Sequence, residues 1–135
     1  MLKRVRLAVV LFWGYAAIWT TLLLVPDPAA FLWFPVGMPE QLARWPVPVD
    51  KVVHASGYFV LMLLAAAAFN SKSAGVGIAW LIAGGAAHGA LTELTQLAIP
   101  SREGDWGDFV VDVVGLGIGA LVWKLVRRSG RARAR

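Results

Sequence analysis

Residues 75–99 read GVGIAWLIAGGAAHGALTELTQLAI and are followed directly by Pro100. A helix needs about 20 mainly apolar residues to cross a hydrocarbon core of about 30 Å, so this stretch is long enough to span a membrane. Its second half carries polar side chains at His88, Thr92, Glu93, Thr95 and Gln96. Ionisable groups at bilayer depth are costly and are usually paired or functional, so these residues are the first candidates for a working site.

The composition of the whole chain is that of a membrane protein. Of its 135 residues, 59% are hydrophobic and 16% are charged, which is too little polar surface for a soluble domain of this length. Three further apolar stretches, at 7–25, 52–69 and 109–126, are long enough or nearly long enough to cross a bilayer. The first exceeds a typical signal-peptide core, so we interpret it as a retained anchor. We predict an all-α fold, a single domain formed by an integral membrane bundle of four transmembrane helices.

Basic residues are concentrated on one side of this predicted bundle. Most of the 13 lysines and arginines lie before the first stretch, between the second and third, or after the core of the fourth. Cytoplasmic segments carry an excess of basic residues, so both termini are predicted to be cytoplasmic. Residues 26–51 then form an outer loop with a short helix at 40–45, and residues 127–135 form a basic tail suited to anionic lipid. No basic domain remains that would bind a nucleic acid.

The absence of cysteine excludes several kinds of site. The chain has no cysteine, so a disulfide framework, a thiolate metal site and a thiol nucleophile are all ruled out. Its histidines, with Glu93 and Asp112, have side chains that can coordinate zinc. No compact motif such as HExxH is present, however, so we predict neither a metal site nor a cofactor.

The second and fourth stretches carry polar faces of their own. Asp50, His54 and Tyr58 follow one another at intervals of four residues, as do Asp108 and Asp112. Residues four apart lie on one face of a helix, so both faces are expected to meet the polar side of residues 75–99 at the outer end of the bundle. An alternative for Asp50 and Asp108 is that each caps the start of its helix.

Arg102 lies in the loop between the third and fourth stretches. Beside Glu93, Asp108 and Asp112 it is suited to pair with a carboxylate, or to clamp a phosphate or carboxylate that enters from outside. We expect a pocket that narrows from a charged mouth to a floor at His88.

Two pairs of glycines have the spacing of close helix contacts. Gly115 and Gly119 continue the face of Asp112, and Gly85 and Gly89 flank His88. Small residues at this spacing let helix backbones approach closely, so we expect the third and fourth helices to pack together through both pairs.

Four motifs follow one another along the chain: DKxxHxxxY at 50–58, HGxxxExxQ at 88–96, PxR at 100–102 and DxxxDxxGxxxG at 108–119. Their order and spacing resemble the VanZ-like family of small bacterial membrane proteins, over roughly half of the chain. In that family the position of Asp112 is usually asparagine, so this chain has an ionisable carboxyl group where the family has an amide. The resemblance implies a multi-pass protein of the bacterial cytoplasmic membrane, associated with the cell envelope and with teicoplanin-type glycopeptide resistance.

The resemblance and the polar faces together predict a ligand-binding set: Asp50, Lys51, His54, Tyr58, His88, Glu93, Gln96, Arg102, Asp108 and Asp112. Our first hypothesis is that this set binds an amphiphile: a membrane lipid of the envelope, a lipid-linked cell-wall precursor or a lipoglycopeptide. The reason for this hypothesis is that Arg102, which can bind an anion, is expected beside the apolar walls of the pocket.

Three alternatives remain open from the sequence. In a membrane enzyme acting on a phosphate- or carboxylate-bearing lipid, His54 or His88 would be the general base, with Glu93 or Asp112 orienting it and Arg102 holding the phosphate. Protons or ions could pass along His88, Glu93 and Asp112, although the inner halves of the second and fourth stretches offer no polar path. The same polar groups can also serve only to hold the helices together.

Overall fold

Four α-helices make up the part of the chain that the computed structural model describes, which comprises residues 2–26, 48–69, 76–100 and 104–132. They are α1 (Leu2–Leu24), α4 (Val49–Phe69), α5 (Ile78–Gln96) and α6 (Trp106–Ala132). The all-helical fold predicted from the sequence is confirmed. The expected short helix at 40–45 lies outside the described residues.

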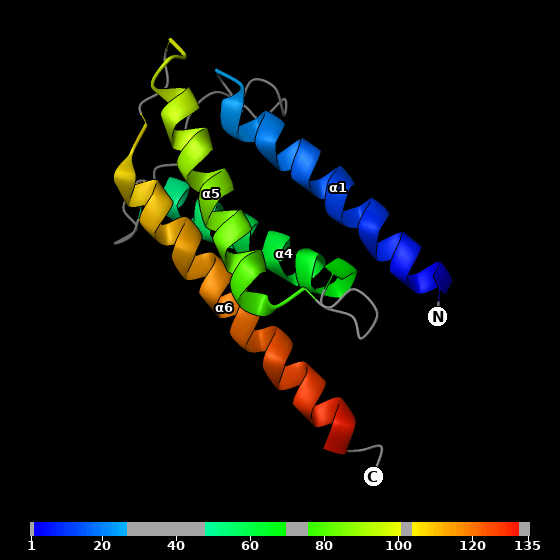
Figure 1. Cartoon of the computed structure of the whole chain (residues 1–135). Coiled ribbons are helices and arrows are strands. Elements are labelled where there is room, and N and C mark those ends of the chain that lie inside the picture. Colours follow the sequence, from blue (N-terminus) through cyan, green and yellow to red (C-terminus); the bar gives the residue numbers. More distant parts are fainter. Residues whose placement is uncertain (1, 27–47, 70–75, 101–103, 133–135) are drawn as a thin grey trace.

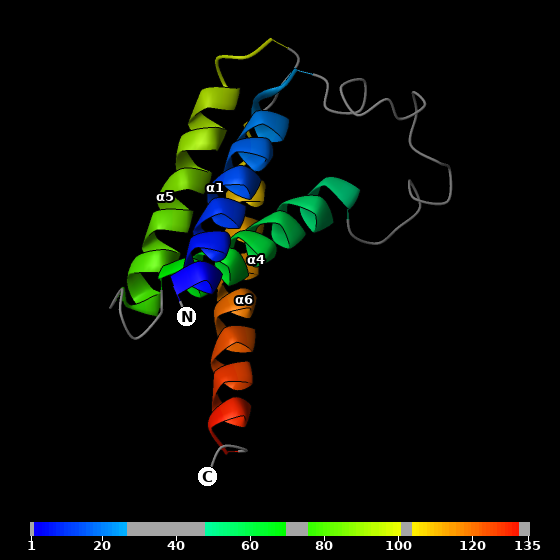
Figure 2. The ribbon, with the colours of Figure 1, turned by 90° about the vertical axis from the view of Figure 1, so that its right-hand side faces the viewer.

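Successive helices run in opposite directions (Figure 1). The start of α1 and the end of α6 therefore point towards the same end of the bundle, with α6 extending beyond its neighbours. Figure 2 shows α4 lying obliquely across the bundle. It contacts α1, α5 and α6, and its contact with α6 is the most extensive of all. The second predicted helix is thus the centre of the structure.

Three of the helices are long and apolar enough to cross a membrane: Val5–Leu24, Val49–Phe69 and Trp106–Gly130. This confirms the prediction of transmembrane helices. The fourth, α5, has 19 residues and is shorter than the predicted 75–99 stretch. It ends early because a residue that precedes proline disfavours the helical conformation, and Pro100 closes the stretch. Leu97 instead caps the helix, and its N–H donates to the carbonyl of Glu93.

The other boundaries also differ from the predicted ones. α4 begins at Val49 rather than near residue 52, so Asp50 lies in its first turn. α6 begins at Trp106 and continues to Ala132, so most of the predicted basic tail is helical. Arginine and alanine favour helix, so Arg127, Arg128 and Ala132 support this extension past the less favourable Ser129 and Gly130.

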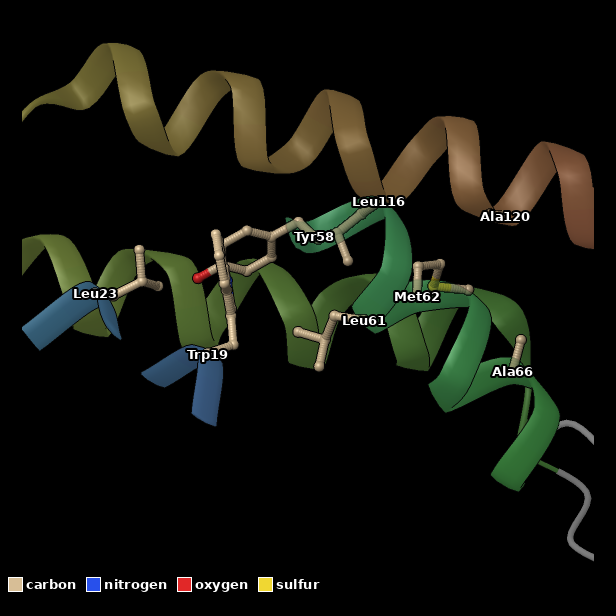
Figure 3. Close-up of a cluster of buried hydrophobic side chains, with 8 residues drawn as sticks. All are labelled: Trp19, Leu23, Tyr58, Leu61, Met62, Ala66, Leu116 and Ala120. Atoms are coloured by element: carbon tan, nitrogen blue, oxygen red, sulfur yellow. The ribbon is translucent and has the colours of Figure 1, made fainter. Parts of the chain in front are cut away.

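A buried apolar cluster lies where α1, α4 and α6 meet (Figure 3). It consists of Trp19, Leu23, Tyr58, Leu61, Met62, Ala66, Leu116 and Ala120. Half of these residues belong to α4, while α5 adds only partly buried side chains such as Leu81 and Ile82. α5 is therefore the helix whose packing depends most on polar contacts.

Glycines bring α6 into backbone contact with α4. A Cβ atom placed on Gly115 would overlap the carbonyl oxygen of Ala55, and one on Gly119 would lie 2.9 Å from the carbonyl oxygen of Phe59. The expectation that this pair would pack against the third helix was wrong, because it faces α4. The pair on α5, Gly85 and Gly89, does face α6, with Gly85 against Leu116 and Gly89 against Asp112.

Candidate functional site

Six polar side chains are buried among α4, α5 and α6: His54, Thr92, Glu93, Gln96, Asp108 and Asp112. All except Thr92 belong to the ligand-binding set predicted from the sequence. The structure therefore brings the polar faces of the three helices together, as their spacing indicated.

The central contact of this group is between His54 and Asp112. Nδ1 of His54 donates to Oδ1 of Asp112 over 3.1 Å, and Asp112 is fully buried. Nε2 of His54 lies 3.9 Å from Oδ2 of Asp108. The ring of Trp19 meets the imidazole edge-on, with centroids 6.3 Å apart. Because carboxylates lie near both ring nitrogens, the orientation of His54 is set on both sides.

His88 belongs to a second chain of hydrogen bonds, which reaches α1. Its Nε2 lies 2.8 Å from Oγ1 of Thr20, and its Nδ1 lies 2.9 Å from the hydroxyl of Tyr58. The Thr20 hydroxyl already donates to the carbonyl of Ala16 over 2.7 Å, so it must accept from Nε2 of His88. The hydroxyl of Tyr58 is shared between Nδ1 of His88 and Oγ1 of Thr92, which lies 3.4 Å away and itself donates to the carbonyl of Gly89. Both nitrogens of His88 are therefore occupied by hydroxyl groups.

Glu93 and Gln96 connect α5 to other parts of the chain. Oε2 of Glu93 accepts the backbone N–H of Asp105 over 2.8 Å. Gln96 donates to the carbonyl of Leu23 over 2.7 Å, which attaches α5 to α1. Oε1 of Glu93 and Oδ2 of Asp112 are buried without a hydrogen-bond partner among the described residues.

Lys51 binds acidic residues at the edge of this buried group, which we call the charged edge: Asp50, Asp105 and Asp108. Its ammonium donates to Asp108 over 2.7 Å and also to Asp105, and it lies 3.8 Å from Asp50. Asp105 accepts the N–H of Gly107 over 2.7 Å, so Asp105 caps α6. The capping role considered for Asp108 was therefore assigned to the wrong residue. Asp50 lies within the first turn of α4, with its side chain 59% exposed, and is not part of the buried group.

Several residues differ from their predicted roles or were missed. Thr95 is exposed and donates to Leu91 within its own helix, so it does not share the buried face. Arg102 lies outside the described residues. Thr20 and Asp105 were not predicted. For Thr20 the available signal was a pair of threonines, Thr20 and Thr21, in a mainly apolar stretch, and Asp105 precedes α6, where a cap is expected.

A cavity of about 280 Å³ lies between α1, α4 and α5. Its walls are almost entirely apolar, and among its lining residues only His88 has an ionisable side chain. A second, more open groove follows α1 from Trp13 to Pro26, and His88 lines this groove as well. The expected charged mouth is not part of either cavity, because the acidic residues bind Lys51, His54 or backbone amides instead.

No protein-family model matches this chain, and no similar curated protein or solved structure was found. The resemblance to the VanZ-like family therefore rests on the sequence motifs alone and stays a prediction.

Asp105 allows a direct test of the charged edge. Replacing it by alanine removes both the cap of α6 and a partner of Lys51, so we expect a lower melting temperature; Asp105→Asn keeps a capping oxygen and should lose less. Hydrogen bonding from Lys51 lowers the pKa of Asp105 below its ordinary value. The contribution of its charge is thus complete above the ordinary pKa and is lost as the pH falls through the lowered one.

Thermal unfolding of the purified protein in detergent, at neutral pH and in acid, measures both effects. Wild type and Asp105→Asn should converge in acid. Equal melting temperatures for wild type and Asp105→Ala at neutral pH would contradict the assigned roles.

Proposed function

We propose that this chain is a four-span, VanZ-like protein of the bacterial cytoplasmic membrane that binds an envelope amphiphile and contributes to glycopeptide resistance. The ligand is a membrane lipid, a lipid-linked cell-wall precursor or a lipoglycopeptide, and both termini are cytoplasmic. The observation that carries the binding proposal is the apolar cavity between α1, α4 and α5, in which His88 lies among hydrophobic side chains.

The arrangement of α5 supports a fourth membrane crossing. Its polar residues Thr92, Glu93 and Gln96 are buried against the other helices, whereas large apolar side chains such as Trp80 and Leu91 are exposed. At about 1.5 Å per residue its 19 residues extend about 28 Å, close to the thickness of a hydrocarbon core. The termini at one end of the bundle agree with a common, cytoplasmic side (Figure 1).

The cavity has the character of a site for an apolar chain. Ligand pockets are mostly apolar with a few polar groups that orient the ligand, and they occupy about 300 to 1,000 Å³. Trp13 of α1 and Trp80 of α5 line the cavity and are 61% and 77% exposed. An acyl or prenyl chain in the bilayer would therefore enter between α1 and α5.

The groove along α1 would continue the site towards a polar head group. It passes Thr20 and Thr21 and reaches Pro26, where the predicted outer loop begins. Arg102 follows the end of α5 in the chain and is the residue that we assign to an anionic head group, since guanidinium groups bind phosphate and carboxylate in a bidentate manner.

A second candidate, a membrane enzyme, is favoured by the buried pair of His54 and Asp112. A carboxylate that orients an imidazole is a common arrangement in general base catalysis. Full biological activity in both His54→Ala and His88→Ala would remove this candidate, while leaving the binding proposal in place.

Filling the cavity tests the binding proposal. A Cβ atom on Gly84 meets nothing within 4 Å although Gly84 lines the cavity, so leucine fits there and occupies the space. We expect Gly84→Leu to weaken binding of a photoreactive polyprenyl phosphate by about tenfold or more, which is the loss of about 1.4 kcal/mol of binding free energy. Gly117→Leu is the matched control, because position 117 is equally open but lies on α6 outside the cavity.

The binding experiment uses purified protein in detergent, with phosphatidylglycerol and teicoplanin as further probes. Failure of the wild type to bind any of the three probes would overturn the proposal, as would equal binding by the two leucine variants. In cells, expression of wild type and Gly117→Leu should lower teicoplanin susceptibility, and expression of Gly84→Leu should not.

A further inference from the structure

Three buried side chains from three helices place donor atoms close together: His54 from α4, Glu93 from α5 and Asp112 from α6. One nitrogen or oxygen from each lies within 4.8 Å of the other two. The residues are 7%, 4% and 0% exposed, so the cluster is enclosed by protein. We propose that these three side chains form a site for a divalent transition-metal cation of the Zn²⁺ type.

Two buried carboxylate oxygens without a hydrogen-bond partner in the described part of the chain are suited to bind a cation. Oε1 of Glu93 and Oδ2 of Asp112 are both buried without a hydrogen-bond partner among the described residues. Leaving a buried charged oxygen without a partner is costly, so such oxygens in native proteins are normally paired or bound to a metal. One cation between the two carboxylates would satisfy both.

Two other basic side chains of the described residues lie near the cluster, and both are already engaged elsewhere. Lys51 binds Asp105 and Asp108. Both nitrogens of His88 are hydrogen-bonded to uncharged hydroxyls, those of Thr20 and Tyr58, whereas Nδ1 of His54 faces a carboxylate that can share a metal with it. Among the described residues, His54 is thus the histidine that is placed to share the two carboxylates with a metal ion.

The geometry suits zinc coordination. Ligands about 2.0 Å from a tetrahedral Zn²⁺ are about 3.3 Å apart, and the carboxylate of Asp112 already approaches Nδ1 of His54 to 3.1 Å through Oδ1. To bind the metal, Nδ1 would release the proton that it now donates to Oδ1. Shifts within the side-chain torsions would bring the third donor from within 4.8 Å to this separation. An imidazole with two carboxylates favours Zn²⁺ or a similar transition metal over Mg²⁺ or Ca²⁺, which prefer oxygen ligands alone.

The residues around the cluster hold its members in place. Oδ2 of Asp108 lies 3.9 Å from Nε2 of His54, on the opposite side of the ring from Asp112, and Lys51 holds Asp108. The backbone N–H of Asp105 binds the other oxygen of Glu93. Metal-binding histidines and carboxylates are commonly oriented by such outer contacts. With three protein ligands, one coordination position is left for water or another ligand.

Metal content tests this inference independently of the proposed function. The full chain, carrying an affinity tag without histidines, is purified in detergent, stripped with a chelator, exposed to Zn²⁺ and freed of excess metal. Mass spectrometry should find about one Zn²⁺ per wild-type chain and less than about one tenth of that in Glu93→Gln and Asp112→Asn. Asp50→Asn, which removes an exposed carboxylate from α4, should retain the metal.

A metal content in wild type no higher than that of Asp112→Asn would overturn the proposal, and so would an equal loss in Asp50→Asn. X-ray absorption spectroscopy of the zinc-loaded wild type is a second test, which measures the ligands around the metal and needs no variant. A shell of nitrogen and oxygen ligands near about 2.0 Å that includes one imidazole supports the site, and a shell without imidazole contradicts it.

Discussion

Gly115→Leu is expected to prevent the bundle from folding. Even the first side-chain carbon at this position would overlap the carbonyl oxygen of Ala55, in the middle of the contact between α4 and α6. A backbone carbonyl cannot move aside as a flexible side chain can, so the two helices would have to separate. Overpacking of a core costs about 1 to 3 kcal/mol and more where no side chain can yield, and we expect at least about 3 kcal/mol here.

Gly117→Leu is the matched control for this prediction. It lies on the same helix two residues away, where an added Cβ atom meets nothing within 4 Å. Its stability should be unchanged or slightly increased, since leucine favours helix over glycine by roughly 0.5 to 1 kcal/mol. Thermal unfolding and size-exclusion chromatography in detergent measure both variants. A monodisperse Gly115→Leu protein with the melting temperature of wild type would contradict the described helix contact.

Gly57→Leu is expected to release α1 from the bundle, and Trp19→Ala to make that substitution tolerable. A Cβ atom on Gly57 would overlap the indole of Trp19. That indole is 8% exposed and packs edge-on against Tyr58, with ring centroids 6.3 Å apart. Since α1 forms one wall of the apolar cavity, its displacement should also abolish binding of the polyprenyl phosphate probe.

The two substitutions should be strongly non-additive. Trp19→Ala alone removes a large buried ring and should cost about 3 to 5 kcal/mol. Gly57→Leu alone should cost about 3 kcal/mol, but in the double variant the leucine occupies space that the indole has left. We expect the double variant to be more stable than the sum of the single changes by about 1 to 3 kcal/mol. Simple additivity in denaturant unfolding would mean that Trp19 and Gly57 do not share this space.

The polar faces of the helices could be predicted because helix geometry repeats every 3.6 residues. The four-residue spacing of His54 and Tyr58, and of Asp108 and Asp112, was enough to place each pair on one face. The same helical repeat gave the wrong prediction for Thr95. Its position relative to His88 suggested a shared face, yet it lies on the exposed surface of α5.

The partners of these polar groups could not be predicted in the same way. A helical pattern shows which residues share a side but does not show which helix covers that side. Thr20, which contacts Nε2 of His88, comes from an apolar stretch that gave no reason to pair it with α5. Similarly, the glycines of α6 were assigned to the wrong neighbour, because small-residue spacing is the same for any closely packed helix.

The sequence by itself determined that this chain forms apolar helices long enough for a membrane, and that polar residues gather on one face of each later helix. Those properties follow from composition and from the helical repeat, which are local. Only the tertiary structure decided that α4 lies at the centre, that an apolar cavity forms beside His88, and that His54, Glu93 and Asp112 converge. These depend on how the helices cross, which is governed by contacts between residues far apart in the chain, such as Gly115 with Ala55.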